Sequence, residues 1–86
     1  MDIKLSKQAK KYLDKCDGKT YNRLKKAIDR LANFDGDIEK LKGFKDKYRL
    51  KKPPYRILFR YTIGNDFIYV EGIHPRGDAY KKGRSR

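Results

Sequence analysis

The stretch that decides the fold is Lys47–Tyr61, which reads KYRLKKPPYRILFRY. Polar and apolar residues alternate in it on both sides of the Pro53–Pro54 pair. Side chains of a β-strand point alternately to its two faces, so the pattern predicts two half-buried strands joined by a loop that contains both prolines. One face is apolar and aromatic, with Tyr55, Ile57, Phe59 and Tyr61. The side chains of this face are expected in the core. The other face is mostly cationic, with Lys47, Arg49, Lys51, Arg56 and Arg60.

Length and composition restrict the kinds of protein that the chain can be. The 86 residues allow one small domain, spanning 1–86. The chain has no run of about 18 apolar residues, so a membrane-spanning helix is not predicted. The N-terminus also lacks an apolar signal region, and we therefore expect a cytoplasmic protein. Cys16 is the single cysteine and His74 the single histidine, which excludes an internal disulfide and a structural zinc site. We expect Cys16 to be a small core residue.

The net charge of +13 is the second constraint. The excess of basic residues is +5 over residues 1–43 and +8 over residues 44–86. Such a charge predicts attraction to nucleic acid or to a strongly acidic protein, and charge alone does not choose between them. Because cations gathered on one surface repel each other unless an anion meets them, the interpretation favoured here is RNA binding.

The first half of the chain is expected to be mainly helical. Asp2–Leu5 is a possible short strand, and Ser6 is a suitable N-cap for a first helix. The Asp17–Gly18 pair predicts the end of that helix, since glycine adopts a left-handed conformation easily. A second helix is predicted over Thr20–Asn33. The short connection makes an antiparallel helical hairpin, which covers the apolar face of the sheet.

The second half is expected to form the sheet. Residues 38–47 show no clear periodicity and predict a connection in which Leu41, Gly43 and Phe44 dock onto the sheet. Strands are predicted over 47–51, 55–63 and 67–73, with a tight hairpin turn over 63–67. The tail after residue 73 is polar and basic, and we expect its end to be frayed. The predicted fold class is α+β, with two N-terminal helices packed on one face of a small antiparallel β-sheet.

The sequence contains none of the familiar catalytic sets. It has no phosphate-binding glycine loop and no Ser/His/Asp arrangement, and we expect neither a metal nor a cofactor. RNA can nevertheless be cut by its own 2′-hydroxyl if one group removes a proton, another protonates the leaving oxygen, and cations stabilise the phosphate. Arginine, lysine and tyrosine suit these tasks. The candidates of these types are Arg49, Lys51, Arg56, Arg76 and Tyr80.

Four segments, taken in order, resemble the RelE/ParE superfamily of bacterial and archaeal toxins, in particular the RelE-type toxins of toxin–antitoxin pairs. They are Leu41-Lys42-Gly43, Tyr48-Arg49-Leu50-Lys51, Tyr55-Arg56-Ile57-Leu58-Phe59 and Ile73-His74-Pro75-Arg76-Gly77-Asp78-Ala79-Tyr80. The resemblance covers nearly the whole chain. It implies a compact antiparallel sheet with two helices on one face, and a metal-independent endoribonuclease that cuts mRNA in the A site of the 70S ribosome. It also implies inhibition by a cognate antitoxin, a small acidic protein encoded next to the toxin.

The resemblance also suggests roles for individual residues. Arg49 and Lys51 match the paired basic positions of the family on the first long strand of the sheet. Arg56 matches the arginine that steadies the phosphate in the transition state. Arg76 is similar to the arginine linked to leaving-group protonation or charge stabilisation, and Tyr80 to the tyrosine that stacks on the RNA or orients it.

The chain departs from the family pattern at two points. Arg49 stands where a lysine is often found, so Lys51 is the better candidate for the general base. The closing motif varies between members, some of which carry a histidine there, so His74 is either structural or shares or takes over the role of the acid. Further RNA contacts are expected from the basic residues around these positions and from His74. They are Lys47, Arg60, His74, Lys81 and Lys82.

Two other functions stay open. ParE-type members of the superfamily poison DNA gyrase and lack the basic catalytic set. A non-enzymatic RNA-binding module would use the same cationic face only to hold phosphates.

Overall fold

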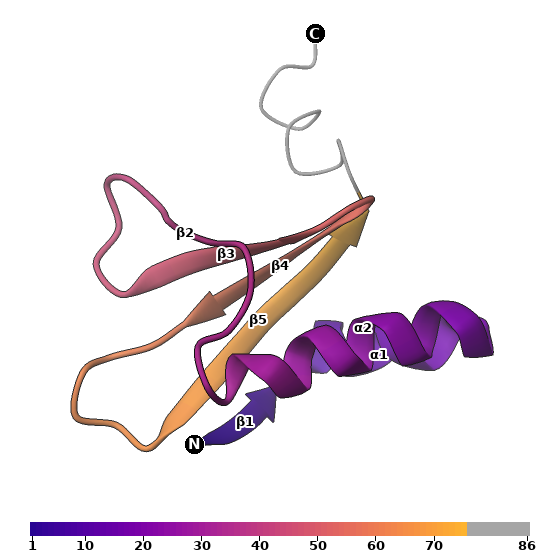
Figure 1. Cartoon of the computed structure of the whole chain (residues 1–86), viewed down its shortest axis with the longest axis horizontal. Coiled ribbons are helices and arrows are strands. Elements are labelled where there is room, and N and C mark those ends of the chain that lie inside the picture. The colour runs from indigo at the N-terminus through magenta and orange to yellow at the C-terminus, as the bar shows by residue number, and fades with distance from the viewer. Residues whose placement is uncertain (76–86) are drawn as a thin grey trace, which may run out of the picture.

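A computed structural model describes residues 1–75 of the chain (Figure 1). Its elements follow the order β1-α1-α2-β2-β3-β4-β5. Both helices lie on the same side of the sheet in Figure 1. None of the helices in residues 1–75 is long and apolar enough to cross a membrane. The bounds are β1 Asp2–Leu5, α1 Lys7–Lys15, α2 Gly18–Leu31, β2 Ile38–Lys40, β3 Lys47–Lys52, β4 Tyr55–Arg60 and β5 Phe67–Pro75.

The strands form one sheet in the order β1-β5-β4-β3-β2. Strands β2 to β5 pair antiparallel, whereas β1 pairs with β5 in parallel. The predicted α+β class, with two helices on one face of the sheet, is confirmed. The parallel β1 is a departure from the expected antiparallel sheet. A four-residue segment at the start of a chain contains no signal for the direction of its partner.

The core lies between the helices and one face of the sheet. Helix α2 contributes Leu24 and Leu31, both fully buried, because apolar residues recur along it at helical spacing. From the sheet, the fully buried side chains include Ile57 and Phe59, which share one parity on β4. Every buried side chain among the described residues is apolar. Tyr55, Tyr61 and Cys16 are half-buried and pack against this core, as the sequence predicted.

The two helix starts are capped by side chains. The Ala9 backbone N–H donates to Ser6 Oγ at 3.1 Å, so the predicted N-cap is confirmed. The prediction that Asp17–Gly18 ends the first helix by a glycine stop is wrong. Helix α1 already ends at Lys15, and Asp17 caps α2 by accepting from the Thr20 N–H at 2.9 Å. The Thr20 side chain, and after it this backbone hydrogen bond, lower the pKa of Asp17, because both stabilise the charged carboxylate.

The segment between α2 and β3 contains a strand that the sequence did not reveal. Ile38 pairs with Leu50 and Lys40 with Tyr48, so β2 forms an edge of the sheet. Three residues are too few for a period-2 pattern to be detected. The expected docking of Phe44 onto the sheet is also wrong, because 53% of its surface is exposed.

The connection between β4 and β5 is longer than the predicted tight turn over 63–67. Strand β4 ends at Arg60, and the turn within the connection is closed by a hydrogen bond from the Asn65 N–H to the Thr62 carbonyl at 3.0 Å. In β5 the register shifts at one residue: Leu58 pairs with Gly72 and Phe59 with Val70. Glu71 is therefore the extra residue of a β-bulge.

Strand β1 pairs with β5 only as far as Val70. Beyond Val70, side chains from the start of α1 form hydrogen bonds with the backbone of β5 instead. Ser6 Oγ donates to the Glu71 carbonyl at 2.6 Å. The Gln8 amide makes two hydrogen bonds with the backbone of Ile73: Nε2 donates to its carbonyl at 3.0 Å, and Oε1 accepts from its N–H at 2.9 Å. These bonds satisfy backbone groups that would otherwise lack a partner at the edge of β5.

Replacing Gln8 with alanine should therefore lower the free energy of unfolding by about 1–3 kcal/mol, because two partly buried backbone groups lose their partners. Urea unfolding followed by circular dichroism measures the change. Lys11→Ala is the matched control, since Lys11 is an exposed residue of the same helix. Equal stability of the two variants would contradict the role given to Gln8.

Candidate functional site

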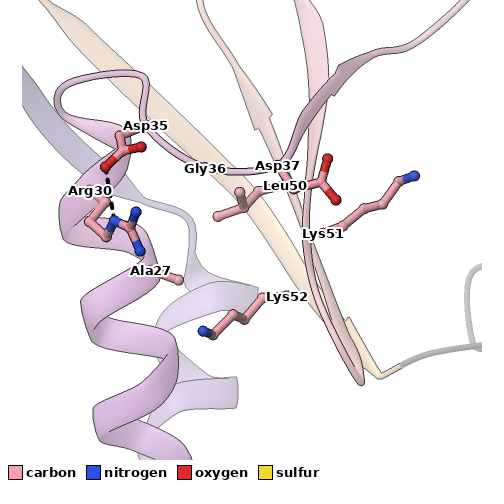
Figure 2. Close-up of a pocket in the computed structure, with 8 residues that line it drawn as sticks. All are labelled: Ala27, Arg30, Asp35, Gly36, Asp37, Leu50, Lys51 and Lys52. Carbon is pink, nitrogen blue, oxygen red and sulfur yellow. Dashed lines mark hydrogen bonds and ion pairs between the residues drawn. The ribbon is translucent and has the colours of Figure 1, made fainter.

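The face of the sheet that turns away from α1 and α2 is called the open face here. On β3, Leu50 is buried against the helices, so its neighbours in the strand, Arg49 and Lys51, belong to the open face. Figure 2 shows the alternation directly: Lys52 extends toward α2, and Lys51 extends to the other side of the strand. On β4, Arg56 and Arg60 alternate with the buried Ile57 and Phe59, which places both arginines on the open face.

Three predicted site residues lie in one row across the open face. Lys51 on β3 is the direct cross-strand partner of Arg56 on β4, and Arg56 is the partner of His74 on β5. Residues that face each other across antiparallel strands have Cβ atoms about 5 Å apart. The side chains of Lys51, Arg56 and His74 thus start from adjacent positions on the open face. This set is called the cationic row below.

The other predicted residues lie near this row or outside the described residues. Lys47 pairs with Arg60 on the open face, four residues along β3 from Lys51. Arg49 lies between the two pairs, opposite Leu58. The remaining predicted site residues belong to the segment beyond residue 75, which is outside the described residues. They are Arg76, Tyr80, Lys81 and Lys82.

Two carboxylates that the sequence analysis did not select balance four of these cations. Glu39 on β2 pairs with Arg49 across the strands and accepts a hydrogen bond from its guanidinium, while Lys51 Nζ lies 3.5 Å from the same carboxylate. Both cations lower the pKa of Glu39, the Arg49 hydrogen bond most strongly. The signal that would have found Glu39 was the edge strand, since only strand pairing brings it opposite Arg49.

Glu71 on β5 likewise pairs with two cations of the open face, Lys47 and Arg60. Its carboxylate lies 3.7 Å from Lys47 Nζ and 3.3 Å from Arg60 Nε. The β-bulge at Glu71 makes this possible, because an extra residue re-aims the side chain. Four cations of the open face are therefore partnered by two carboxylates.

His74 lies close against the sheet because residue 72 is glycine. A Cβ atom at Gly72 would be 2.9 Å from His74 Nε2 and 3.2 Å from Gln8 Oε1. The first separation is shorter than real Cβ atoms show, so any larger residue must displace the imidazole. The absence of a side chain at Gly72 thus leaves the space that the His74 ring occupies.

Two hollows adjoin Lys51. One of about 150 Å³ lies at the β3–β4 hairpin and is lined by Lys51, Pro53, Pro54, Tyr55 and Arg56. The other, of about 400 Å³, lies between α2 and β3 (Figure 2). The walls of the second hollow carry both signs of charge, including the Arg30–Asp35 ion pair at 3.0 Å, and Arg56 does not line it. Of the two, only the smaller hollow is lined by both Lys51 and Arg56.

A cluster of ligands for a metal ion is not found in residues 1–75: no three His, Cys, Asp or Glu side chains there are grouped closely enough.

Comparison with known proteins identifies the family. Residues 3–80 match the family described as "ParE toxin of type II toxin-antitoxin system, parDE". The chain belongs to this toxin family. Within it, this toxin shares the fold of the RelE proteins of RelE–RelB systems. No curated protein matches the sequence.

Solved structures of RelE proteins agree with the toxin in fold and in length. RelE of the archaeal RelE–RelB complex from Pyrococcus horikoshii is 26% identical, with a TM-score of 0.73 over 90% of this chain and 96% of that one. The RelB–RelE complex from Methanococcus jannaschii gives 25% identity and a TM-score of 0.73 over 92% and 96%. The isolated RelE toxin of E. coli, at 22% identity, shows the fold alone, with a TM-score of 0.72 over 99% and 96%.

The Glu39 contacts predict a pH dependence of stability. Because the pKa of Glu39 is lowered in the folded toxin, its charged form stabilises the fold above the ordinary glutamate value of 4.5, and this contribution is lost as the pH falls through the folded pKa. Glu39→Gln should therefore be less stable than the wild type at pH 7 and equally stable at acidic pH, as measured by urea unfolding. In an Arg49→Gln background the effect should shrink. A stability difference that does not change with pH would contradict this assignment.

The close contact at Gly72 predicts a second effect. Gly72→Ala should lower the free energy of unfolding only slightly, by about 0.5–1.5 kcal/mol, because the atoms nearest the new Cβ are the ends of the His74 and Gln8 side chains, which can turn away from it. Gly18→Ala is the matched control, since nothing lies within 4 Å of a Cβ there. In a His74→Ala background the cost of Gly72→Ala should be smaller, and urea unfolding of the four variants measures the coupling. If Gly72→Ala lowered the stability equally in the wild type and in the His74→Ala background, the added Cβ would not be displacing the imidazole.

Proposed function

We propose that this toxin cuts mRNA in the A site of the ribosome by a metal-independent reaction of the RNA 2′-hydroxyl. The observation that carries the proposal is the cationic row of Lys51, Arg56 and His74, which lies across three strands of a face that α1 and α2 leave uncovered. Similarity to RelE proteins at 25–26% identity over nearly the whole chain supports it. A target on the ribosome also implies a cytoplasmic protein.

The proposed reaction gives each group of the row a task. Arg56 lies at the centre and can donate two parallel hydrogen bonds to the phosphate as its negative charge increases in the transition state. Lys51, on one side of Arg56, is the candidate to accept the proton of the 2′-hydroxyl, which requires that its ammonium group has first given a proton to the solvent. On the other side, His74 is proposed to assist protonation of the leaving 5′-oxygen. Arg76 and Tyr80 are proposed to complete the site, Arg76 by stabilising charge and Tyr80 by stacking on the RNA.

A cognate antitoxin is the proposed protein partner. The P. horikoshii and M. jannaschii relatives were solved as complexes with RelB, and the net charge of +13 suits a small acidic protein. The neighbouring reading frame is expected to encode that protein.

Inhibition of DNA gyrase is the second candidate, because the matching family carries the ParE name. The cationic row favours RNA cleavage over this alternative, since ParE-type toxins lack the basic catalytic set. The order of events after brief expression separates the two: a nuclease stops translation first, and a gyrase inhibitor stops replication first.

Arg56→Ala should reduce cleavage of message on translating ribosomes by about 100-fold or more, because the main charge donor to the phosphate is lost. Mapping the 5′ ends of the message measures the rate. Lys26→Ala is the matched control, since it removes an exposed cation from α2 and leaves the open face intact. Wild-type cleavage by a folded Arg56→Ala protein would refute the site.

A further inference from the structure

The loop between β2 and β3 presents an aromatic ring beside the open face. Phe44 has 53% of its surface exposed, in contrast to the fully buried Phe59. Lys47 Nζ lies over the Phe44 ring at 4.8 Å from its centroid, and the same amino group contacts Glu71 on the open face. The ring is therefore connected to the cations of the open face through Lys47.

The position of this loop is fixed by hydrogen bonds at its ends. The Leu41 N–H donates to the Lys47 carbonyl at 3.0 Å, and the Tyr61 N–H to the Asp46 carbonyl at 3.0 Å. Thr62 Oγ1 donates to Asp46 Oδ2 at 3.0 Å. The loop is thus held both to its own strand and to the end of β4, so the ring is presented in a defined place.

We propose that Phe44 and Lys47 form a binding site for one nucleotide of single-stranded RNA, with the base stacked on Phe44 and its phosphate held by Lys47. One face of the ring lies under the Lys47 amino group, and the exposed surface leaves room for a base on the other. The inference rests on the proposed function only in taking RNA as the ligand.

Charge in the loop favours a nucleotide over other partners. Lys42 and Lys45 flank Phe44 and are exposed. A nucleotide supplies an anion and an aromatic face in one unit, whereas an acidic peptide does so only if an apolar side chain follows its carboxylates at the right spacing. Lys47 lies four residues from Lys51, which is about 13 Å along β3. The base bound at Phe44 is therefore not the one at the cationic row, and the loop would fix the position of the RNA from a distance.

The test measures binding of a fluorescent 2′-O-methyl RNA octamer, which cannot be cut through its 2′-oxygens, by fluorescence anisotropy at low salt. Phe44→Ala and Phe44→Leu should each weaken binding about tenfold, because the stacking ring is lost. Phe44→Trp should bind as well as the wild type. Ile63→Ala is the matched control, since Ile63 is an 88% exposed apolar side chain in another loop.

Octamers with one base removed at a time identify the stacked position. For the wild type, removal of the base at one position should weaken binding relative to the intact octamer. For Phe44→Ala, removal of that same base should leave binding unchanged. Wild-type binding by Phe44→Leu would overturn the proposal. So would a loss in Phe44→Ala that is confined to an acidic partner protein, because the loop would then belong to a protein interface.

The proposed function and this inference can fail separately. A toxin that binds RNA through Phe44 but cuts no message on ribosomes would refute the nuclease proposal and leave the stacking site intact. Normal cleavage of message, together with unchanged RNA binding by Phe44→Ala and Phe44→Leu, would refute the stacking site and leave the nuclease proposal intact.

Discussion

The structure depends on burying one face of a small sheet and only one. Helices α1 and α2 supply enough apolar surface to cover that face, with Leu24 and Leu31 against Ile57 and Phe59. Because the side chains of a strand alternate, the same backbone that buries Ile57 must present Arg56 on the opposite face. Core formation and the display of cations are thus two results of one register.

Antiparallel pairing then converts residues that are distant in sequence into a site. The register that places Lys51 opposite Arg56 also places His74 on the other side of Arg56. A shift of one residue would turn all three toward the helices and bury their charges, at a large cost in free energy. The positions of these groups are therefore fixed by the hydrophobic core itself. Glu39 and Glu71 reduce the repulsion among the cations, which lets the folded protein tolerate them.

The sequence predicted those features that repeat along the chain. Alternation over β3 and β4 gave the strands, their faces and the parity of Arg56. Features that depend on a single contact were not predictable in this way. Asp17 could end one helix or begin the next, and only its hydrogen bond to Thr20 decides. Glu39 and Phe44 lie in a segment without periodicity, so neither the ion pair with Arg49 nor the exposed ring could be inferred from pattern.

Gln8 has a consequence for how molecules of this toxin meet one another. Its amide presents to Ile73 the same acceptor and donor that a neighbouring strand would present, yet it belongs to a helix and stops after one residue. Together with Ser6, which pairs with the Glu71 carbonyl, it occupies backbone groups of β5 to which a strand from a second molecule would otherwise bond. Two uncharged side chains thus make this edge a poorer template for strand addition, and they do so without adding to the high positive charge of the chain.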